Sequence, residues 1–284
     1  MLRPAPPAGR SLAALRASYL AASLLILVIQ LTPALRRRFL AYGSRATPHP
    51  STGAAEPPVK QSAFHRLLDR AAAIQVPHNY FTHFYITSVA CSLFWACWLR
   101  VWEATPHMQL VWSLMLLQGV RRMFESFAYT STSTSSMWFA HWVLGLLFYL
   151  TINVAIWIEG LDSPPRLWAT AVLVPAILTA HVLQHSYHAY LYRLRTENKG
   201  YQLPLHPVFS NLLCPHYTCE VVIYLLLSFL AAPQRRMVNW TLVCATIFVA
   251  TNLGVTAAGT KEWYTHKFGL AKVGPRKRMI PRVW

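Results

Sequence analysis

The sequence predicts an all-α integral membrane protein with about seven transmembrane helices. Apolar residues make up 55% of the 284-residue chain and charged residues only 12%, whereas soluble domains carry about 25% charged residues. Several apolar runs approach the roughly 20 residues that a helix needs to cross a bilayer. These runs occupy most of the chain, so we expect one polytopic membrane domain over residues 1–284 and no second folded unit.

Seven apolar segments, of unequal quality, follow one another along the chain. They cover residues 17–35, 80–102, 107–121, 137–158, 166–189, 216–232 and 238–258. The first runs directly into Arg36-Arg37-Arg38 with no small-residue cleavage pattern, so we interpret it as a retained span rather than a signal peptide. The third is the weakest, because only the stretch from Met108 to Val120 is free of charge.

The loops between these segments carry the charge. Residues 36–79 are predicted to form a cytosolic loop, flexible over its Pro-, Ser- and Thr-rich part at 43–62. If the N-terminus lies outside and the sides alternate, most of the 26 basic residues fall in inner loops and in the C-terminal tail. This asymmetry follows the positive-inside rule and indicates a cytosolic C-terminus. The net charge of +17 therefore does not require a nucleic-acid partner.

Sequence signatures of several enzyme classes are missing. The chain has no GxSxG elbow, no GxGxxG after a strand and no GxxxxGK[ST] loop. His181, His185 and His188 form HxxxHxxH, a pattern that suits a metal. Membrane di-iron oxygenases, however, combine such boxes with paired histidines, and this chain has no His-His pair. We therefore predict no metal site, and a bound nucleotide would need a fold that is neither Rossmann nor P-loop.

Glu220 is the most informative single residue, because it leads directly into the apolar run 221–227. Intramembrane acids are costly and usually face a cavity in which they have a function. His216 and Tyr217 lie four and three residues earlier, so on a helix all three share one face. This group indicates a reactive or ligand-binding corner; the alternative is a glutamate at a helix end, at the level of the headgroups.

The fifth segment carries a polar stripe at helical spacing. Its members are His181, Gln184, His188, Tyr192 and Arg195. In lipid such a face must meet other helices or a water-filled cavity, so we interpret it as the lining of a site.

Basic residues on the predicted inner side have two interpretations. Arg121, Arg122, Arg195 and Lys199 could hold phosphate groups by forked and point-charge contacts. They could equally be topological anchors. We include Arg121 and Arg122 among the candidate cofactor-binding residues.

Residues 76–284 resemble the steroid 5α-reductase family, and specifically its polyprenol (polyprenal) reductase branch. The resemblance is carried by the order and spacing of several short elements. They are Leu194-Arg195, Pro204, Cys214-Pro215-His216-Tyr217-Thr218-Cys219-Glu220, Asn252-Leu253, Trp263-Tyr264 with Lys267-Phe268, and the basic ending 276–281. Residues 76–85 and Gln118-Gly119-Val120-Arg121-Arg122-Met123-Phe124-Glu125 are similar to the polyprenol reductases rather than to the steroid-specific enzymes.

The resemblance implies seven membrane helices in the endoplasmic reticulum, an NADPH site open to the cytosol and a lipid cavity between helices. Residues 120–284 would be the catalytic region. The reaction would be reduction of the α-isoprene double bond of a long-chain polyprenyl lipid, on the route to the dolichol used in N-glycosylation. Hydride adds readily only to an alkene conjugated to an electron-withdrawing group, so we favour polyprenal over polyprenol as the direct acceptor. No obligate protein partner is evident.

The resemblance also assigns roles to individual positions. By family position, the cofactor site comprises Gln184, His188, Arg195, His216, Glu220 and Tyr264. Arg195 would hold a phosphate, while Glu220 and His216 would orient the nicotinamide so that hydride donor and acceptor lie about 3–3.5 Å apart. A donor must polarise the carbonyl oxygen; His83 and Tyr85 are our candidates, although both could instead belong to an interfacial aromatic band.

Three other functions stay open on the sequence. The chain could be a steroid or enoyl reductase of the same kind, an isoprenylcysteine methyltransferase-like enzyme, or a non-enzymatic lipid-binding protein. Two differences argue against a steroid substrate. The stretch Thr256-Ala257-Ala258-Gly259-Thr260 lacks the arginine and histidines of the steroid-specific members. Those members also carry a substrate-binding glutamate on the second span, and the residues near that position in this chain are His83 and Phe84.

Overall fold

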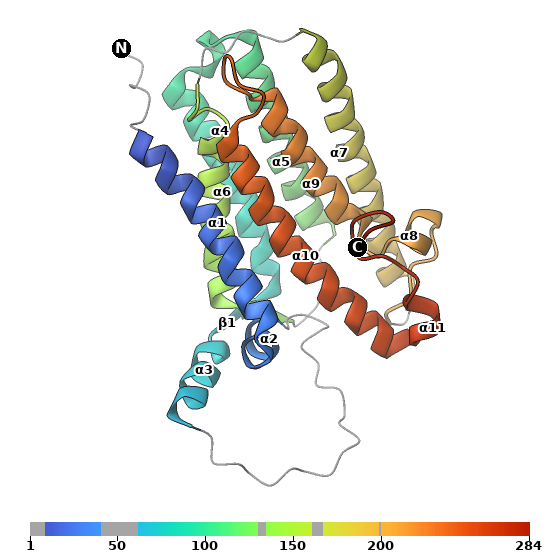
Figure 1. Ribbon diagram of the computed structural model, residues 1–284. Coiled ribbons are helices and arrows are strands. Elements are labelled where there is room, and N and C mark those ends of the chain that lie inside the picture. The colour runs from blue at the N-terminus through green and yellow to red at the C-terminus, as the bar shows by residue number, and fades with distance from the viewer. Residues whose placement is uncertain (1–8, 41–61, 130–134, 161–166, 199) are drawn as a thin grey trace, which may run out of the picture.

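The computed structural model describes residues 9–40, 62–129, 135–160, 167–198 and 200–284, and most of them are helical (Figure 1). The long helices are α1 (Gly9–Leu31), α4 (Phe81–Leu99), α5 (Pro106–Ala128), α6 (Phe139–Ala155), α7 (Leu167–Thr196), α9 (Pro215–Leu230) and α10 (Trp240–Phe268). Shorter helices are α2 (Pro33–Phe39), α3 (Ala63–Ala73), α8 (Pro207–Asn211) and α11 (Leu270–Val273). The long helices pack as one bundle, in which α7 lies against α9, α1 and α9 against α10, and α4 against α5 and α6.

A helix lies in each of the seven predicted segments. By length and composition, α1, α10 and the part of α7 from Ala169 onwards are able to cross a membrane, and α6 and α9 are shorter apolar helices. The apolar composition of these helices confirms the predicted membrane character. That all seven long helices cross the bilayer stays a prediction.

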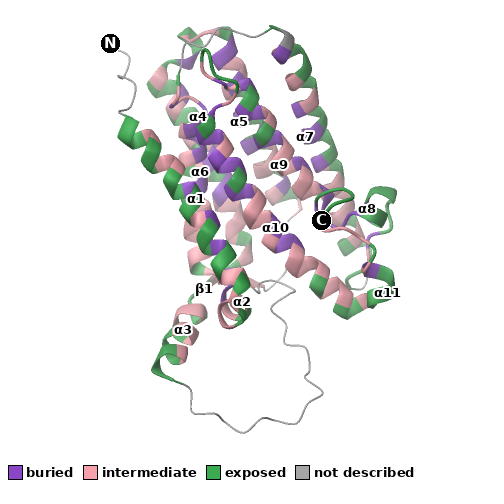
Figure 2. Ribbon diagram, viewed as in Figure 1, coloured by how far each residue is buried: buried purple, intermediate pink, exposed green. Residues whose placement is uncertain are grey.

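The outward faces of the bundle are apolar, as lipid requires. On α1, Leu24 and Leu25 are 63% and 60% exposed, and Figure 2 shows exposed residues along this helix. On α7, Val182 is 65% exposed while His181 and Gln184 are buried. Polar groups inside and apolar groups outside reverse the pattern of a helix in a soluble domain. The polar stripe predicted for the fifth segment thus points into the protein at His181 and Gln184, and it ends at the exposed Arg195.

The third segment is longer than predicted. The sequence suggested an end near residue 121, where the charges begin, but α5 continues to Ala128 with Arg121, Arg122 and Glu125 in its last turns. The helix tolerates these charges because they neutralise one another: both arginines form salt bridges with Glu125.

The segment 36–79, predicted to be a loop, contains regular structure. Helix α2 ends within this segment and α3 follows. Strand β1 (Gln75–Pro77) then pairs antiparallel with β2 (Ser136–Trp138), with Gln75 opposite Trp138. These short strands make the described part of the chain not purely helical. Ser62 begins α3 by accepting a hydrogen bond from His65 N at 3.3 Å. Most of the stretch predicted to be flexible lies outside the described residues.

The end of the bundle opposite α3 is held by a buried carboxylate. Glu159, in the turn after α6, accepts hydrogen bonds from Thr241 N and Oγ1 at 2.5 and 2.6 Å, and its side chain is 3% exposed. Arg16 on α1 completes the cluster at 2.8 Å. One carboxylate thereby caps α10 and connects it to α1 and α6.

Replacing Glu159 with alanine is expected to lower the thermal unfolding temperature without changing the affinity for ligands in the cavities described below. Loss of a helix cap costs about 1 kcal/mol, and the partly exposed Arg16 would lose its partner, so we expect about 1–3 kcal/mol in total. Thermal unfolding in detergent measures the effect. The matched control is Glu103→Gln, in an exposed ion pair with Arg100; equal unfolding temperatures for the two variants would contradict the capping role.

Candidate active site

Glu220 lies in a network of amide side chains between α5, α7 and α9. Gln118 donates its Nε2 hydrogen to Glu220 Oε1 at 2.8 Å, and Gln184 donates to Oε2. Gln184 Nε2 is also 3.1 Å from the carbonyl oxygen of His216. Both glutamines are 2% exposed. The glutamate is therefore held inside the protein by two donors, and it does not sit free at a helix end.

Arg121 connects this network to the rest of α5 and α7. Its Nη2 donates to Gln118 Oε1 at 2.7 Å and to Gln184 Oε1, its Nε to His181 Nδ1 at 3.2 Å, and its Nη1 to Glu125 Oε1 at 2.6 Å. Because both glutamine oxygens accept from Arg121, both amide groups must present their N–H sides to Glu220. Arg121 thus fixes the orientation of the two amide groups that donate hydrogen bonds to Glu220.

Glu125 is the residue of this site to which the sequence analysis gave no role. Its carboxylate is 1% exposed and contacts four basic side chains. These are Arg121 at 2.6 Å, Arg122, His185 at 2.9 Å and His188 at 2.7 Å. Two residues of the HxxxHxxH pattern are therefore hydrogen-bonded to a carboxylate, and among the described residues no group of His, Cys, Asp and Glu is arranged to hold a metal. The signal for Glu125 was its spacing of three and four residues from two arginines.

Arg122 extends the network to α4. Its Nη1 contacts Glu125 and lies 2.9 Å from His188 Nδ1, while its Nη2 donates to Tyr85 OH at 2.6 Å. Tyr85 is 7% exposed. Since the arginine occupies an acceptor position of the phenol oxygen, the hydroxyl hydrogen of Tyr85 is left to point elsewhere.

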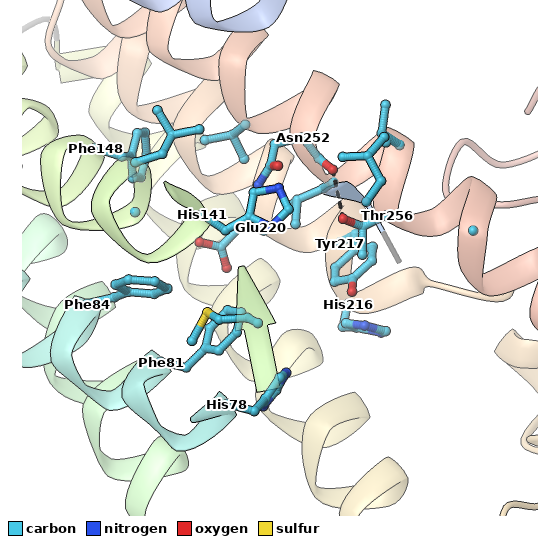
Figure 3. Close-up of a pocket in the computed structure, with 18 of the residues that line it drawn as sticks. His78, Phe81, Phe84, His141, Phe148, His216, Tyr217, Glu220, Asn252 and Thr256 are labelled. Carbon is cyan, nitrogen blue, oxygen red and sulfur yellow. Dashed lines mark hydrogen bonds between the residues drawn. The ribbon is translucent and has the colours of Figure 1, made fainter. Parts of the chain in front are cut away.

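A cavity of about 820 Å³ lies beside the network (Figure 3). Glu220 projects into it near Phe84 and His141, and His216 and Tyr217 lie at one side of the same view. Much of the remaining wall is apolar, from Leu144, Phe148, Tyr149, Phe248, Val249 and Leu253. This volume is in the range of small-molecule sites, roughly 300–1,000 Å³, and its walls suit an apolar ligand with one polar end.

A second cavity, of about 520 Å³, adjoins the first and is more polar. The residues that line this cavity but not the first include Glu125, Tyr192, Arg195, Tyr201, Gln202, Thr260 and Tyr264. The two cavities share lining residues, chiefly Tyr85, Arg122, His188, His216 and Tyr217. A ligand in either cavity would therefore meet the same wall.

Most of the predicted site residues line these cavities. Gln184 and Glu220 line the first, Arg195 and Tyr264 the second, and Tyr85, Arg122, His188 and His216 both. Arg121 lines neither, because its guanidinium is directed at protein side chains. Lys199 lies outside the described residues.

His83 is also outside both cavity linings. Its ring packs on Tyr80, with centroids 4.4 Å apart, and at 6.1 Å from Trp142. His83 therefore packs among aromatic rings, and its assignment as a carbonyl donor or as part of an interfacial aromatic band stays a prediction. The structure separates the two residues, since only Tyr85 reaches the shared wall.

The start of α9 is positioned by the C-terminal tail. The backbone N–H groups of Leu213 and Cys214 donate to the carbonyl oxygens of Lys277 and Arg278, both at 2.9 Å, and Thr218 donates to Met279 O. Arg276 holds the preceding loop through the carbonyl oxygen of Pro204 at 2.7 Å. The basic ending therefore fixes the turn from which His216 and Glu220 project.

A polar wall with paired charges, set between two cavities in an apolar helical bundle, is typical of a membrane enzyme with a partly apolar ligand site. The chain belongs to the 3-oxo-5-alpha-steroid 4-dehydrogenase family, whose model matches residues 120–284. This confirms the resemblance to the steroid 5α-reductases, and the protein is accordingly an oxidoreductase that acts on a carbon–carbon double bond.

Individual relatives are polyprenal reductases. The chain is 29% identical over 223 residues to polyprenal reductase of Saccharomyces cerevisiae, covering 77% of this chain and 79% of that protein. It is 24% identical over 275 residues to polyprenal reductase 2 of Oryza sativa subsp. japonica, covering 69% and 76%. Polyprenal reductase of Caenorhabditis elegans is 28% identical over 200 residues, covering 63% and 62%.

Proposed function

We propose that this protein reduces the α-isoprene double bond of polyprenal, with NADPH as the hydride donor. One observation carries the proposal: Tyr85, Arg122, His188 and His216 form a wall shared by an apolar cavity and a polar one. An apolar isoprenoid suits the first cavity and a charged dinucleotide the second. Their reacting ends must meet, and the wall that the two cavities share is where they can do so. The similarity to polyprenal reductases supports the same substrate.

The membrane arrangement that we propose follows from the same bundle. The seven long helices would each cross or line the bilayer as a single domain, with 120–284 as the catalytic region, in the endoplasmic reticulum and with a cytosolic C-terminus. The exposed leucines of α1 and the buried polar face of α7 support this arrangement. The net polyprenol-to-dolichol conversion would then serve N-glycosylation.

The polar cavity has groups that fit NADPH. Arg195 and Tyr264 line it, and the guanidinium suits a phosphate. His216 lines both cavities, and its Nδ1 is buried without a hydrogen-bond partner among the described residues. Buried polar atoms are rarely left unsatisfied, so this nitrogen fits an amide of a bound ligand. When bound, NADPH would supply the hydride. Its nicotinamide end would reach past the shared wall to Glu220, which lines the apolar cavity and, held by Gln118 and Gln184, would orient it.

Tyr85 is the donor that we assign to the substrate oxygen. Addition of hydride to the β-carbon of an enal moves electron density to the carbonyl oxygen, and a preorganised donor stabilises that charge. The phenol accepts a hydrogen bond from Arg122 at 2.6 Å, so its own O–H is available to the aldehyde. Polyprenol offers no such conjugated oxygen, which is why the aldehyde is the better acceptor.

Tyr85→Phe is expected to lower kcat about 100-fold, in the range seen when one oxyanion donor is removed. The ring is retained, so KM for NADPH should stay near the wild-type value. Steady-state kinetics with polyprenal separates the two parameters. His83→Ala is the matched control on the same helix and is expected to keep wild-type turnover; a larger loss in this variant than in Tyr85→Phe would reverse our assignment.

Arg195→Ala is expected to raise KM for NADPH roughly 10- to 100-fold, because a charge-assisted contact to phosphate contributes about 1.5–3 kcal/mol. Arg195→Lys should recover part of the affinity, since lysine offers a point charge without the fork. Titration of NADPH fluorescence measures binding directly. An unchanged dissociation constant in the alanine variant would place the phosphates elsewhere.

The overall reaction is tested with purified protein and NADPH. Polyprenal, polyprenol and a steroid enone are incubated separately, and each lipid is followed by mass. We expect polyprenal to gain two hydrogens and polyprenol to gain none. Reduction of the steroid alone would favour the steroid reductase alternative, and methyl transfer from S-adenosylmethionine the methyltransferase alternative.

A further inference from the structure

Helix α3 exposes large apolar side chains to its surroundings, whereas two of its polar residues, His65 and Asp69, contact Arg38 of α2. Phe64 and Leu67 are each 63% exposed, and Ile74, directly after the helix, is 59% exposed. On the inner side, Asp69 Oδ1 accepts from Arg38 Nε at 2.5 Å, and His65 Nδ1 is 3.4 Å from Arg38 Nη2. A helix on a soluble domain turns its apolar side inward, so α3 is built for an apolar environment outside the protein.

Basic residues stand at the edge of this apolar face. Arg66 and Arg70 are exposed, four residues apart and therefore on one side of the helix, next to Leu67 and Ile74 by helical spacing. Such a helix, apolar on one face with arginines along the border, lies in the plane of a membrane surface. Its arginines keep their charges among the headgroups while their stems cover apolar surface. Anionic headgroups complement this charge.

The position of α3 fits a membrane surface. It lies beyond the ends of α1 and α6 rather than alongside them (Figure 1). Because α1 is long and apolar enough to span the bilayer, a membrane surface must lie near the end of that helix. The outer face of α3 is therefore at the level where headgroups and acyl chains meet.

The helix is also fixed to the bundle. Trp138 Nε1 donates to Ala71 O at 2.9 Å, and Phe139 N donates to Ile74 O at 2.9 Å. The Trp138 ring packs on Phe39 of α2, with centroids 4.3 Å apart. Any force that the membrane exerts on α3 is thus transmitted to α2 and to the start of α6.

This attachment matters because α2 forms part of the larger cavity. Arg36, Arg37 and Leu40 line it at the end of the bundle that carries α3. We propose that α3 is an in-plane membrane helix that binds anionic phospholipid and holds the α2 end of this cavity at the bilayer surface, where the polar end of a lipid substrate resides. The lipid contact itself is independent of the proposed reaction; its role in substrate entry rests on that function.

The test uses the full chain in vesicles, without substrate. Cys91 and Cys97 are replaced by alanine, and an environment-sensitive fluorophore is attached at Leu67→Cys or, as the matched control, at Ala73→Cys. Ala73 is exposed on the same helix and lies on the side away from the apolar stripe. Vesicles contain phosphatidylcholine and phosphatidylserine, one of which carries a nitroxide on its acyl chain. The parent protein without an introduced cysteine, treated with the same fluorophore, corrects for reaction at the remaining cysteines.

We expect blue-shifted emission at position 67 and severalfold stronger quenching there than at position 73. Labelled phosphatidylserine should quench more than labelled phosphatidylcholine, and Arg66→Gln with Arg70→Gln should abolish the difference. Equal aqueous quenching by iodide at both positions would overturn the proposal, as would equal quenching by both lipids. Shielding of position 67 that rises with the protein-to-lipid ratio would assign the face to a second copy instead. Because turnover is not measured, failure here is distinguishable from failure of the proposed reaction.

Discussion

Replacing Glu220 with glutamine is expected to lower kcat/KM for polyprenal reduction about 10- to 100-fold in a protein that still folds. The two carboxylate oxygens accept from Gln118 and Gln184, whose amide orientation is fixed by Arg121. A glutamine offers one oxygen and one NH₂, so one donor would face another donor. A buried donor left unsatisfied costs about 1–3 kcal/mol, which is the size of the expected loss in rate.

Kinetics and binding together measure this effect. NADPH titration should show weakened binding, and single-turnover rates at saturating NADPH should also fall, because the nicotinamide would be misaligned as well as less tightly held. The control is Glu103→Gln, an exposed glutamate paired with Arg100 at the far end of α4. Wild-type turnover of Glu220→Gln would mean that the carboxylate is structural and that other groups orient the nicotinamide.

Local patterns in the sequence were enough to place Glu220. A carboxylate leading into an apolar run is anomalous without any knowledge of the fold, and the spacing of His216 to Glu220 follows from the helix alone. The stripe on α7 was predictable for the same reason: its exposed Val182 and buried Gln184 express a helical period. Both features are properties of a single helix.

The partners of these residues could not be predicted in that way. Glu125 and Gln118 meet His188 and Glu220 across more than 60 residues of sequence, and such contacts depend on how α5, α7 and α9 pack. The same limit applies to His83 and Tyr85. They are two residues apart on α4 and equally aromatic in character, yet only the packing against Arg122 decides which one reaches the cavity wall.

Helix α3 was missed for a different reason. It follows a stretch rich in Pro, Ser and Thr, and it is too short for its composition to indicate a membrane helix. Its apolar residues also lie on the outside, where a soluble-protein rule would place polar ones. What identifies it is the ion pair of Asp69 with Arg38, because that contact shows which side faces the protein.

Glu125→Gln is expected to destabilise the bundle strongly. The carboxylate is 1% exposed and faces Arg121, Arg122, His185 and His188, which come from α5 and α7. Removing one partner of a buried ion pair costs about 3–5 kcal/mol, because the remaining charges are left uncompensated. Glutamine keeps the shape but not the charge, so the loss reports on electrostatics rather than on a cavity.

Thermal unfolding in detergent, with and without NADPH, measures the cost, and a double-mutant cycle with Arg122→Gln isolates its origin. If the carboxylate mainly compensates Arg122, the double variant should be about 0.5–3 kcal/mol more stable than the sum of the single effects. Tyr85 would lose its donor in the Arg122 variant, so turnover should fall even where stability recovers. Additive effects would show that Glu125 acts mainly through its other partners, Arg121, His185 and His188. An unchanged unfolding temperature for Glu125→Gln would show that α5 and α7 are held together without this carboxylate, and Glu125 would then be a ligand-facing residue of the polar cavity.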